Sequence, residues 1–174
     1  LEDLVALTLA AYEGRGVALI RKVPDPWRVV RRGGRIAGAF PERKGLVDYI
    51  GVWRSRAVAF DCKECARRLE FSKVPPHQLE FLLRWQACGG IAGLLLWFWR
   101  EGAFAWLPAG EAARALAEGK RGLGLAECLT RGSRVPEGRG QPLDLESVCV
   151  FHGIRPGFYV MPTTIPSDAD HRCT

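Results

Sequence analysis

The sequence predicts an α/β domain in which helices flank a mixed central β-sheet. Two observations favour this class. Segments with helical and strand spacing follow one another in the order helix, strand, hairpin, strand, strand, helix, strand, strand, helix. Residues 91–99 form a nearly continuous apolar run, which is typical of a central strand buried on both faces. The chain has 174 residues, 48% of them hydrophobic, so it can bury such a core without disulfides or a structural metal.

The first third of the chain predicts a helix, a strand and a hairpin. Apolar residues recur at helical spacing up to Tyr12, and a glycine-rich turn follows. Residues 16–22 are predicted as a strand that ends before two prolines. Residues 28–40 place two β-prone arms around Gly33-Gly34, which is a hairpin pattern.

The rest of the chain alternates between apolar strands and amphipathic helices. Beyond the hairpin, we expect strands at residues 46–53, 57–62, 91–99 and 103–107 and helices at residues 77–88, 108–118 and 142–151. The first of these helices is apolar on most sides, so we expect it to be largely buried. Asp144 is expected to cap the last helix. Residues 119–140, rich in Gly and Arg, are predicted as a loop.

These elements predict one domain over residues 1–152, with a basic hairpin inserted at residues 28–44 and an extended tail over residues 153–174. The six tryptophans are expected in the core, although Trp27, beside the hairpin, is also placed to stack on a base. No apolar run reaches the ~18 residues that a membrane span requires, and no signal peptide is recognisable. Because the chain begins at Leu1 rather than Met, we expect residues upstream.

The cysteines invite a zinc interpretation, which the spacing disfavours. Cys62 and Cys65 form a C-x-x-C, but they lie in a strand, where residues three apart point to opposite faces. The other four cysteines are scattered and form no second pair of this kind. We therefore expect reduced, mostly buried thiols, which suit a cytoplasmic protein, or the host cytoplasm if the chain is encoded by a phage.

The charge balance favours a polyanionic partner. The net charge is +6, and arginine, whose planar fork grips phosphate, supplies most of the positive charge. Basic residues gather on and around the predicted hairpin: Arg28, Arg31, Arg32, Arg35, Arg43 and Lys44. Two interpretations remain open. The hairpin is either a prong that contacts nucleic acid or a solvated edge whose charges prevent aggregation.

Two acids interrupt apolar strands and are the strongest chemical signal in the sequence. Asp48 lies in one strand, and Asp61 lies near the end of the next, with Lys63 on the same face two residues later. Acids on neighbouring strands can hold one Mg²⁺ or Mn²⁺ ion, and a lysine beside them can activate water or steady a phosphate. The alternative is an edge-strand aspartate and an unrelated surface ion pair.

An acid followed about one hairpin later by acid-x-Lys is the pattern of the PD-(D/E)xK nucleases, which have a restriction-endonuclease-like fold. The chain further resembles the RecU family of Holliday junction resolvases from residue 1 to about residue 107. The segments that carry the resemblance are Leu1-Glu2-Asp3, Asp48-Tyr49-Ile50-Gly51, Phe60-Asp61-Cys62-Lys63-Glu64, His77-Gln78 and Gly90-Ile91.

The resemblance implies a homodimer that resolves four-way DNA junctions in recombination and repair, with a projecting hairpin that enters the junction. The implied catalytic residues are Glu2, Asp48, Asp61, Lys63 and Gln78. The implied ligands of Mg²⁺ or Mn²⁺ are Glu2, Asp48, Asp61 and the backbone carbonyl of Cys62. One departure is an aspartate at position 61, where the family usually has the longer glutamate. Without the resemblance, Glu2 would be interpreted as an acid that the helix dipole favours in a first turn, and Gln78 as a polar residue at the start of a helix.

Three functions remain open on the sequence. The first is a junction-resolving endonuclease, the second another PD-(D/E)xK endonuclease of restriction or repair type, and the third a non-catalytic DNA-binding protein. The dimer expected for the first needs an apolar surface. The large apolar residues between Phe81 and Trp106 are a candidate source, unless they only complete the core of one subunit.

Overall fold

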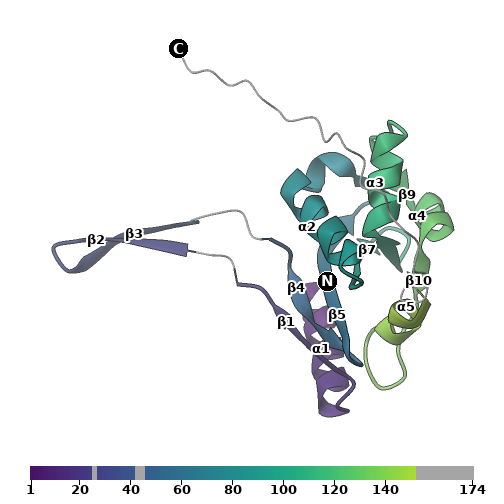
Figure 1. The fold of residues 1–174 in the computed structure, drawn as a ribbon, viewed down its shortest axis with the longest axis horizontal. Coiled ribbons are helices and arrows are strands. Elements are labelled where there is room, and N and C mark those ends of the chain that lie inside the picture. Colours follow the sequence, from purple (N-terminus) through teal and green to yellow (C-terminus); the bar gives the residue numbers. More distant parts are fainter. Residues whose placement is uncertain (25–26, 42–45, 152–174) are drawn as a thin grey trace.

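The computed structural model describes residues 1–24, 27–41 and 46–151, and its centre is a six-stranded mixed sheet (Figure 1). In spatial order the strands are β1 (Ala18–Lys22), β4 (Tyr49–Trp53), β5 (Arg56–Cys65), β7 (Ile91–Phe98), β8 (Ala103–Pro108) and β10 (Ser133–Val135). Strands β5 and β7 are parallel, and the other neighbours are antiparallel. The expected mixed sheet flanked by helices is therefore confirmed.

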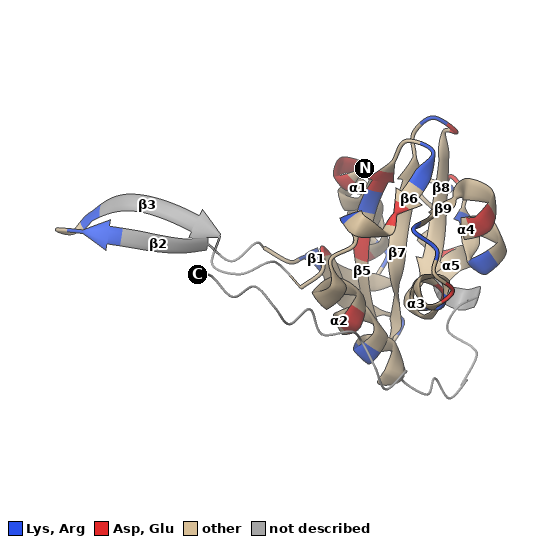
Figure 2. Cartoon of the chain, turned by 90° about the horizontal axis from the view of Figure 1, so that it is seen from above, with Lys and Arg blue, Asp and Glu red and all other residues tan. Residues whose placement is uncertain are grey.

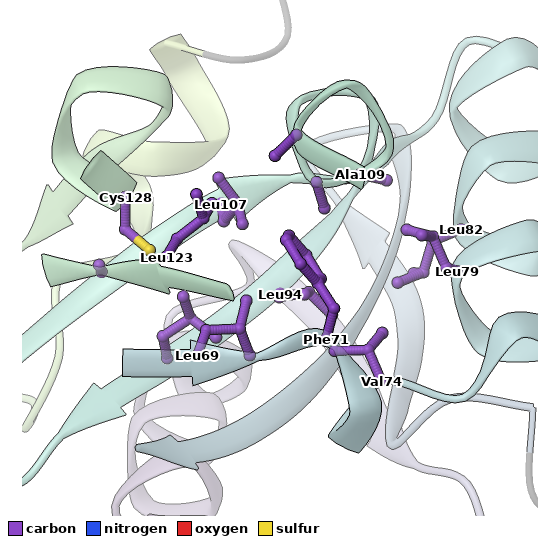
Figure 3. Packing of buried hydrophobic residues seen from close by; sticks show 14 of the residues in the cluster. Leu69, Phe71, Val74, Leu79, Leu82, Leu94, Leu107, Ala109, Leu123 and Cys128 are labelled. Atoms are coloured by element: carbon purple, nitrogen blue, oxygen red, sulfur yellow. The ribbon is translucent and has the colours of Figure 1, made fainter. Parts of the chain in front are cut away.

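A hydrophobic cluster covers each face of this sheet. Helices α1 (Glu2–Gly14) and α5 (Leu145–Phe151) contribute to one cluster. Helices α2 (Pro76–Ala87), α3 (Ala109–Ala117) and α4 (Leu125–Arg131) contribute to the other, part of which Figure 3 shows. Strand β7 supplies both, because Leu94 and Leu96 face one cluster and Leu95 the other. The apolar run is thus a strand buried on both faces, as predicted.

The prediction of a loop over residues 119–140 is wrong. This segment forms β9 (Gly122–Gly124), α4 and β10, and β9 pairs with β6 (Arg68–Glu70), which leads into the short 3-10 helix η1 (Phe71–Lys73). The glycines that suggested a loop permit close packing instead. A Cβ on Gly122 would collide with the carbonyl oxygen of Leu69, and one on Gly132 with that of Trp106.

The predicted hairpin is present as a separate two-stranded sheet of β2 (Trp27–Arg32) and β3 (Arg35–Pro41). Gly33 and Gly34 both have positive φ, as the tight turn between the strands requires. Figure 1 shows the hairpin standing apart from the central sheet. The side chains of Trp27 and Arg28 are not described. Arg43, Lys44 and the expected tail, residues 153–174, lie outside the described residues.

Helix α2 is less buried than its composition predicts. Only Leu79 and Leu82 are buried, whereas Phe81, Leu83 and Trp85 are half-buried. The helix packs on the sheet along one side, so its remaining apolar residues lie at the surface. The expectation that the tryptophans lie in the core holds for Trp53 and Trp106 and fails for Trp99, which is 50% exposed.

The last helix is tied to the first by buried polar contacts. Asp144 caps α5 as predicted, because its Oδ1 accepts hydrogen bonds from the backbone N–H groups of Glu146 (3.0 Å) and Ser147 (3.2 Å). The backbone N–H of Leu143 donates to Oγ1 of Thr8 (3.2 Å), and that of Glu146 also approaches the Tyr12 hydroxyl (3.3 Å). These bonds fix α1 against the sheet. No described helix is long and apolar enough to cross a membrane.

Candidate active site

The candidate site lies where β5 extends beyond its neighbour β4. The pairing of these strands begins at Tyr49 and Phe60, so the following residues of β5 have no partner on that side in β4. The carboxylate of Asp48, just before β4, fills part of this gap, because its Oδ2 accepts a 2.8 Å hydrogen bond from the backbone N–H of Cys62. Asp48, predicted within a strand, thus lies just before the first residue of β4, and its hydrogen bond to Cys62 brings it close to Asp61.

Asp61 is fully buried and lacks hydrogen-bond donors. Its Oδ2 lies 2.5 Å from Nζ of Lys63, an ion-pair contact, yet among the described residues neither carboxylate oxygen has a partner with hydrogen-bond geometry. Burial is the main cause that raises the pKa of Asp61 to about 6, and the charge of Asp48 adds to it, while Lys63 opposes the rise. A buried carboxylate with free oxygens is suited to binding a cation.

Lys63 is held between two predicted partners. Its side chain lies on the same face of β5 as Asp61, as the two-residue spacing predicts. Its Nζ also donates a 3.3 Å hydrogen bond to Oε1 of Gln78, which lies in the first turn of α2. This hydrogen bond joins Lys63 to the first turn of α2. It also shows that Gln78 lies at the candidate site.

Glu2 lies at the rim of this group rather than within it. Its carboxylate is exposed and forms an ion pair with Lys22 at the end of β1. The negative charge of Glu2 nevertheless reaches the thiol of Cys62. Burial raises the pKa of this thiol most, and the charges of the three acids Asp48, Asp61 and Glu2 raise it further. Lys22 is not among the predicted site residues, although the strand before the two prolines places it there.

The donor set fits a hard divalent cation in part. Within the described ranges, no group of three or more His, Cys, Asp or Glu side chains has the geometry of a metal site. The orphaned oxygens of Asp61 and the adjacent carboxylate of Asp48 are the oxygen donors that Mg²⁺ prefers. The carboxylate of Glu2 is instead paired with Lys22.

The cysteines of the C-x-x-C lie in different clusters, as their spacing predicts. Cys65 belongs to the cluster under α2, whereas Cys62 packs against the one under α1. The described cysteines with free thiols are Cys62, Cys65, Cys88 and Cys128. Glu64, expected to be a solvated charge, is exposed and points away from Asp61.

Comparison with known proteins identifies the family. The family model described as "Recombination protein U", RecU, matches residues 1–145. The chain belongs to the RecU family. RecU membership confirms the resemblance, and it extends the match beyond residue 107 into the segment that holds β9, α4 and β10.

Curated RecU relatives share about a quarter to a third of their residues with this chain. "Holliday junction resolvase RecU" of Leuconostoc citreum is 27% identical over 154 residues, which cover 83% of this chain and 75% of the relative. The protein of the same name from Listeria innocua is 26% identical, with coverages of 85% and 80%. That from Geobacillus kaustophilus is 31% identical, with coverages of 56% and 53%.

One solved structure similar to this RecU chain is that of Hjc, a Holliday junction resolvase from Archaeoglobus fulgidus. The two share 17% sequence identity with a TM-score of 0.35, over 75% of this chain and 91% of Hjc.

The burial of Asp61 predicts a stability that depends on pH. Because the pKa of Asp61 rises from its ordinary value of 3.8 to about 6, the folded state binds a proton more tightly than the unfolded state. The stabilisation is complete below about pH 4 and is lost as the pH rises through 6. In EDTA at pH 7.5, D61N should therefore be more stable than the wild type by up to about 3 kcal/mol, as measured by urea denaturation.

The advantage of D61N should shrink towards zero at pH 4. E64Q, which removes an exposed carboxylate from the same strand, is the control and should show no such gain. A wild type that remains the more stable protein at pH 7.5 in EDTA would show that Asp61 is not held ionised at a cost.

Proposed function

We propose that this protein is a divalent-metal-dependent endonuclease that resolves four-way DNA junctions by paired, symmetric nicks and acts in the cytoplasm. The observation that carries the proposal is the buried carboxylate of Asp61 beside Asp48 and Lys63, in a chain that the RecU family matches over residues 1–145. Curated relatives are named Holliday junction resolvases. Two acids and a lysine on adjoining strand ends suit phosphodiester hydrolysis.

The proposed ligands of a Mg²⁺ or Mn²⁺ ion are Glu2, Asp48, Asp61 and the backbone carbonyl of Cys62. When bound, the ion supplies Lewis-acid stabilisation of the charge that develops on the phosphate. The ammonium group of Lys63 orients the attacking water or steadies the scissile phosphate, and its contact with Gln78 keeps it at the site. Lys22 competes for Glu2 and is released when Glu2 turns inward.

We propose that the hairpin supplies the preference for junctions. Arg31, Arg32 and Arg35 are exposed at its tip, and none forms an ion pair within the described part of the chain (Figure 2). A basic tip on a separate two-stranded sheet can enter the centre of a branched DNA by shape and phosphate contact. A general duplex nuclease or a non-catalytic DNA-binding protein needs no such element.

We propose that a second copy covers an apolar face of β1 and β4. Leu19, Ile50 and Val52 are exposed there, and the register places Leu19 opposite Val52. Val52 also pairs with Ala57, which lines a groove of about 500 Å³ together with Phe81 and other residues of α2. Most of the apolar stretch first considered for the dimer belongs to β7 and β8 and is core. A two-fold dimer matches the two-fold symmetry of a junction.

The first prediction concerns catalysis. D48N and D61N should each lower the rate of junction cleavage in Mg²⁺ by about 1,000-fold, because each removes a charged ligand worth several kcal/mol of transition-state stabilisation. K63A should lower the rate similarly while calorimetric Mg²⁺ binding persists. Junction binding in a gel-shift assay should be retained by all three, with E64Q as the matched control. Cleavage by D48N or D61N at the wild-type rate would remove the assigned site.

The second prediction concerns the hairpin. Replacing Arg31, Arg32 and Arg35 by Ala should weaken binding to four-way junctions more than binding to duplex DNA. Each lost phosphate contact should lower the slope of log K against log salt by ~0.9. In the control protein, three exposed arginines elsewhere are replaced: Arg15, Arg134 and Arg139. An equal loss on junction and duplex would make the hairpin a general basic surface.

The third prediction concerns the dimer. Light scattering at micromolar concentration should give about twice the chain mass of 19.3 kDa. V52K places a charge in the apolar face and should give a folded monomer that makes single rather than paired nicks. L7K, at an exposed position of α1, should remain dimeric. Paired nicks by a wild-type monomer in one encounter would contradict the proposed assembly.

A further inference from the structure

Trp99 is the large aromatic residue that the sequence places in the core and the structure places in water. Half of its surface is exposed, whereas Trp53 and Trp106 are almost fully buried. The side chain of Arg100 lies over its ring, with the guanidinium carbon 5.1 Å from the ring centroid. Exposing an indole forgoes the stabilisation that burial of such a large apolar surface provides. A ligand that covers the indole ring would provide this stabilisation.

The position of Trp99 links it to the candidate site. Strands β5 and β7 run parallel with Lys63 opposite Leu96, so Trp99 lies three residues beyond the register position of Lys63, roughly 10 Å along the strand. The backbone N–H of Trp99 donates to the carbonyl oxygen of Cys65 (3.1 Å). This bond places the turn after β5 beside the turn after β7. Figure 2 shows both turns at the end of the sheet where α1 begins.

These two turns carry positive charge. Arg67 and Arg68 follow β5, Arg100 follows Trp99, and all three are exposed without an ion pair in the described part of the chain. The acids on the neighbouring elements are Glu64, Glu70 and Glu101, and Glu70 is paired with Lys73. None of these acids pairs with the three arginines in the described part of the chain, so the guanidinium groups are available to a phosphate backbone.

We propose that Trp99 stacks on an unpaired base at the branch point of the DNA, while Arg100 and the arginines after β5 contact the flanking phosphates. This inference rests on the proposed function for the nature of the substrate. An aromatic platform among unpaired arginines is the combination that binds splayed nucleotides without reading sequence. A protein partner would be served by the apolar residues Leu19, Ile50 and Val52 of β1 and β4, whereas the surface around Trp99 combines a single ring with three arginines.

The test uses a four-way junction with 2-aminopurine at the branch point, bound in EDTA so that the DNA stays intact. The wild type should quench the fluorescence of this base by stacking. W99A should lose most of the quenching and bind the junction about tenfold more weakly, since base–aromatic stacking has that magnitude. W99F should retain most of both effects. Affinity for fully paired duplex should stay within about twofold for all three proteins.

The control variant is L7A, which trims an exposed leucine of α1 and should behave as wild type. Wild-type affinity and quenching by W99A would overturn the stacking proposal, as would an equal loss of affinity for junction and duplex. A forked duplex with unpaired ends, also read in EDTA, reports on Trp99 independently of resolution. Failure of the wild type to cut junctions in Mg²⁺ would instead contradict the proposed function and leave these binding results interpretable.

Discussion

The buried carboxylate of Asp61 is the constraint on which the rest of the site depends. An ionised group without hydrogen-bond donors is costly inside a protein, and here the cost raises the pKa to about 6 even with Lys63 in contact. Hydrogen-bond donors would stabilise the ionised carboxylate but would compete with a cation for the same lone pairs. The ionised carboxylate is therefore stabilised by a second positive charge in addition to that of Lys63.

The sheet creates this position by ending one strand early. Because β4 begins at Tyr49, the backbone N–H of Cys62 is free to hold the carboxylate of Asp48 instead of a strand partner. Helix α1 then approaches from one face and α2 from the other, with Glu2 and Gln78 in their first turns. The polar contacts of Tyr12 with the segment before α5 hold α1 in place, so the last third of the chain supports the site without touching it.

The proposed contacts with DNA and with a second copy lie on different parts of the surface from the chemistry. The basic tip of the β2–β3 hairpin, the apolar face of β1 and β4, and the turn that carries Trp99 are all outside the buried acid pair. Because of this separation, the carboxylate of Asp61 remains buried while the exposed arginines of the hairpin tip remain in solvent, where they can contact phosphate. For the same reason, we expect substitution of the acids to leave the proposed DNA-binding surfaces intact.

The sequence by itself determined the elements and residues whose signals are local. Strand acids, the two-residue step from Asp61 to Lys63, the hairpin glycines and the Asp144 cap follow from spacing and backbone chemistry, and the structure brings Asp48, Asp61, Lys63 and Gln78 together. Only the tertiary structure decided the rest. Strands β6, β9 and β10 are three residues long, too short for a periodic pattern, and they exist because distant strands pair with or pack on them. The apolar run after Gly90 does not show where the strand ends, so the exposure of Trp99 depended on the turn that follows Phe98. The Glu2–Lys22 pair likewise required α1 to lie across the end of β1, a placement set by packing between segments that no local pattern records.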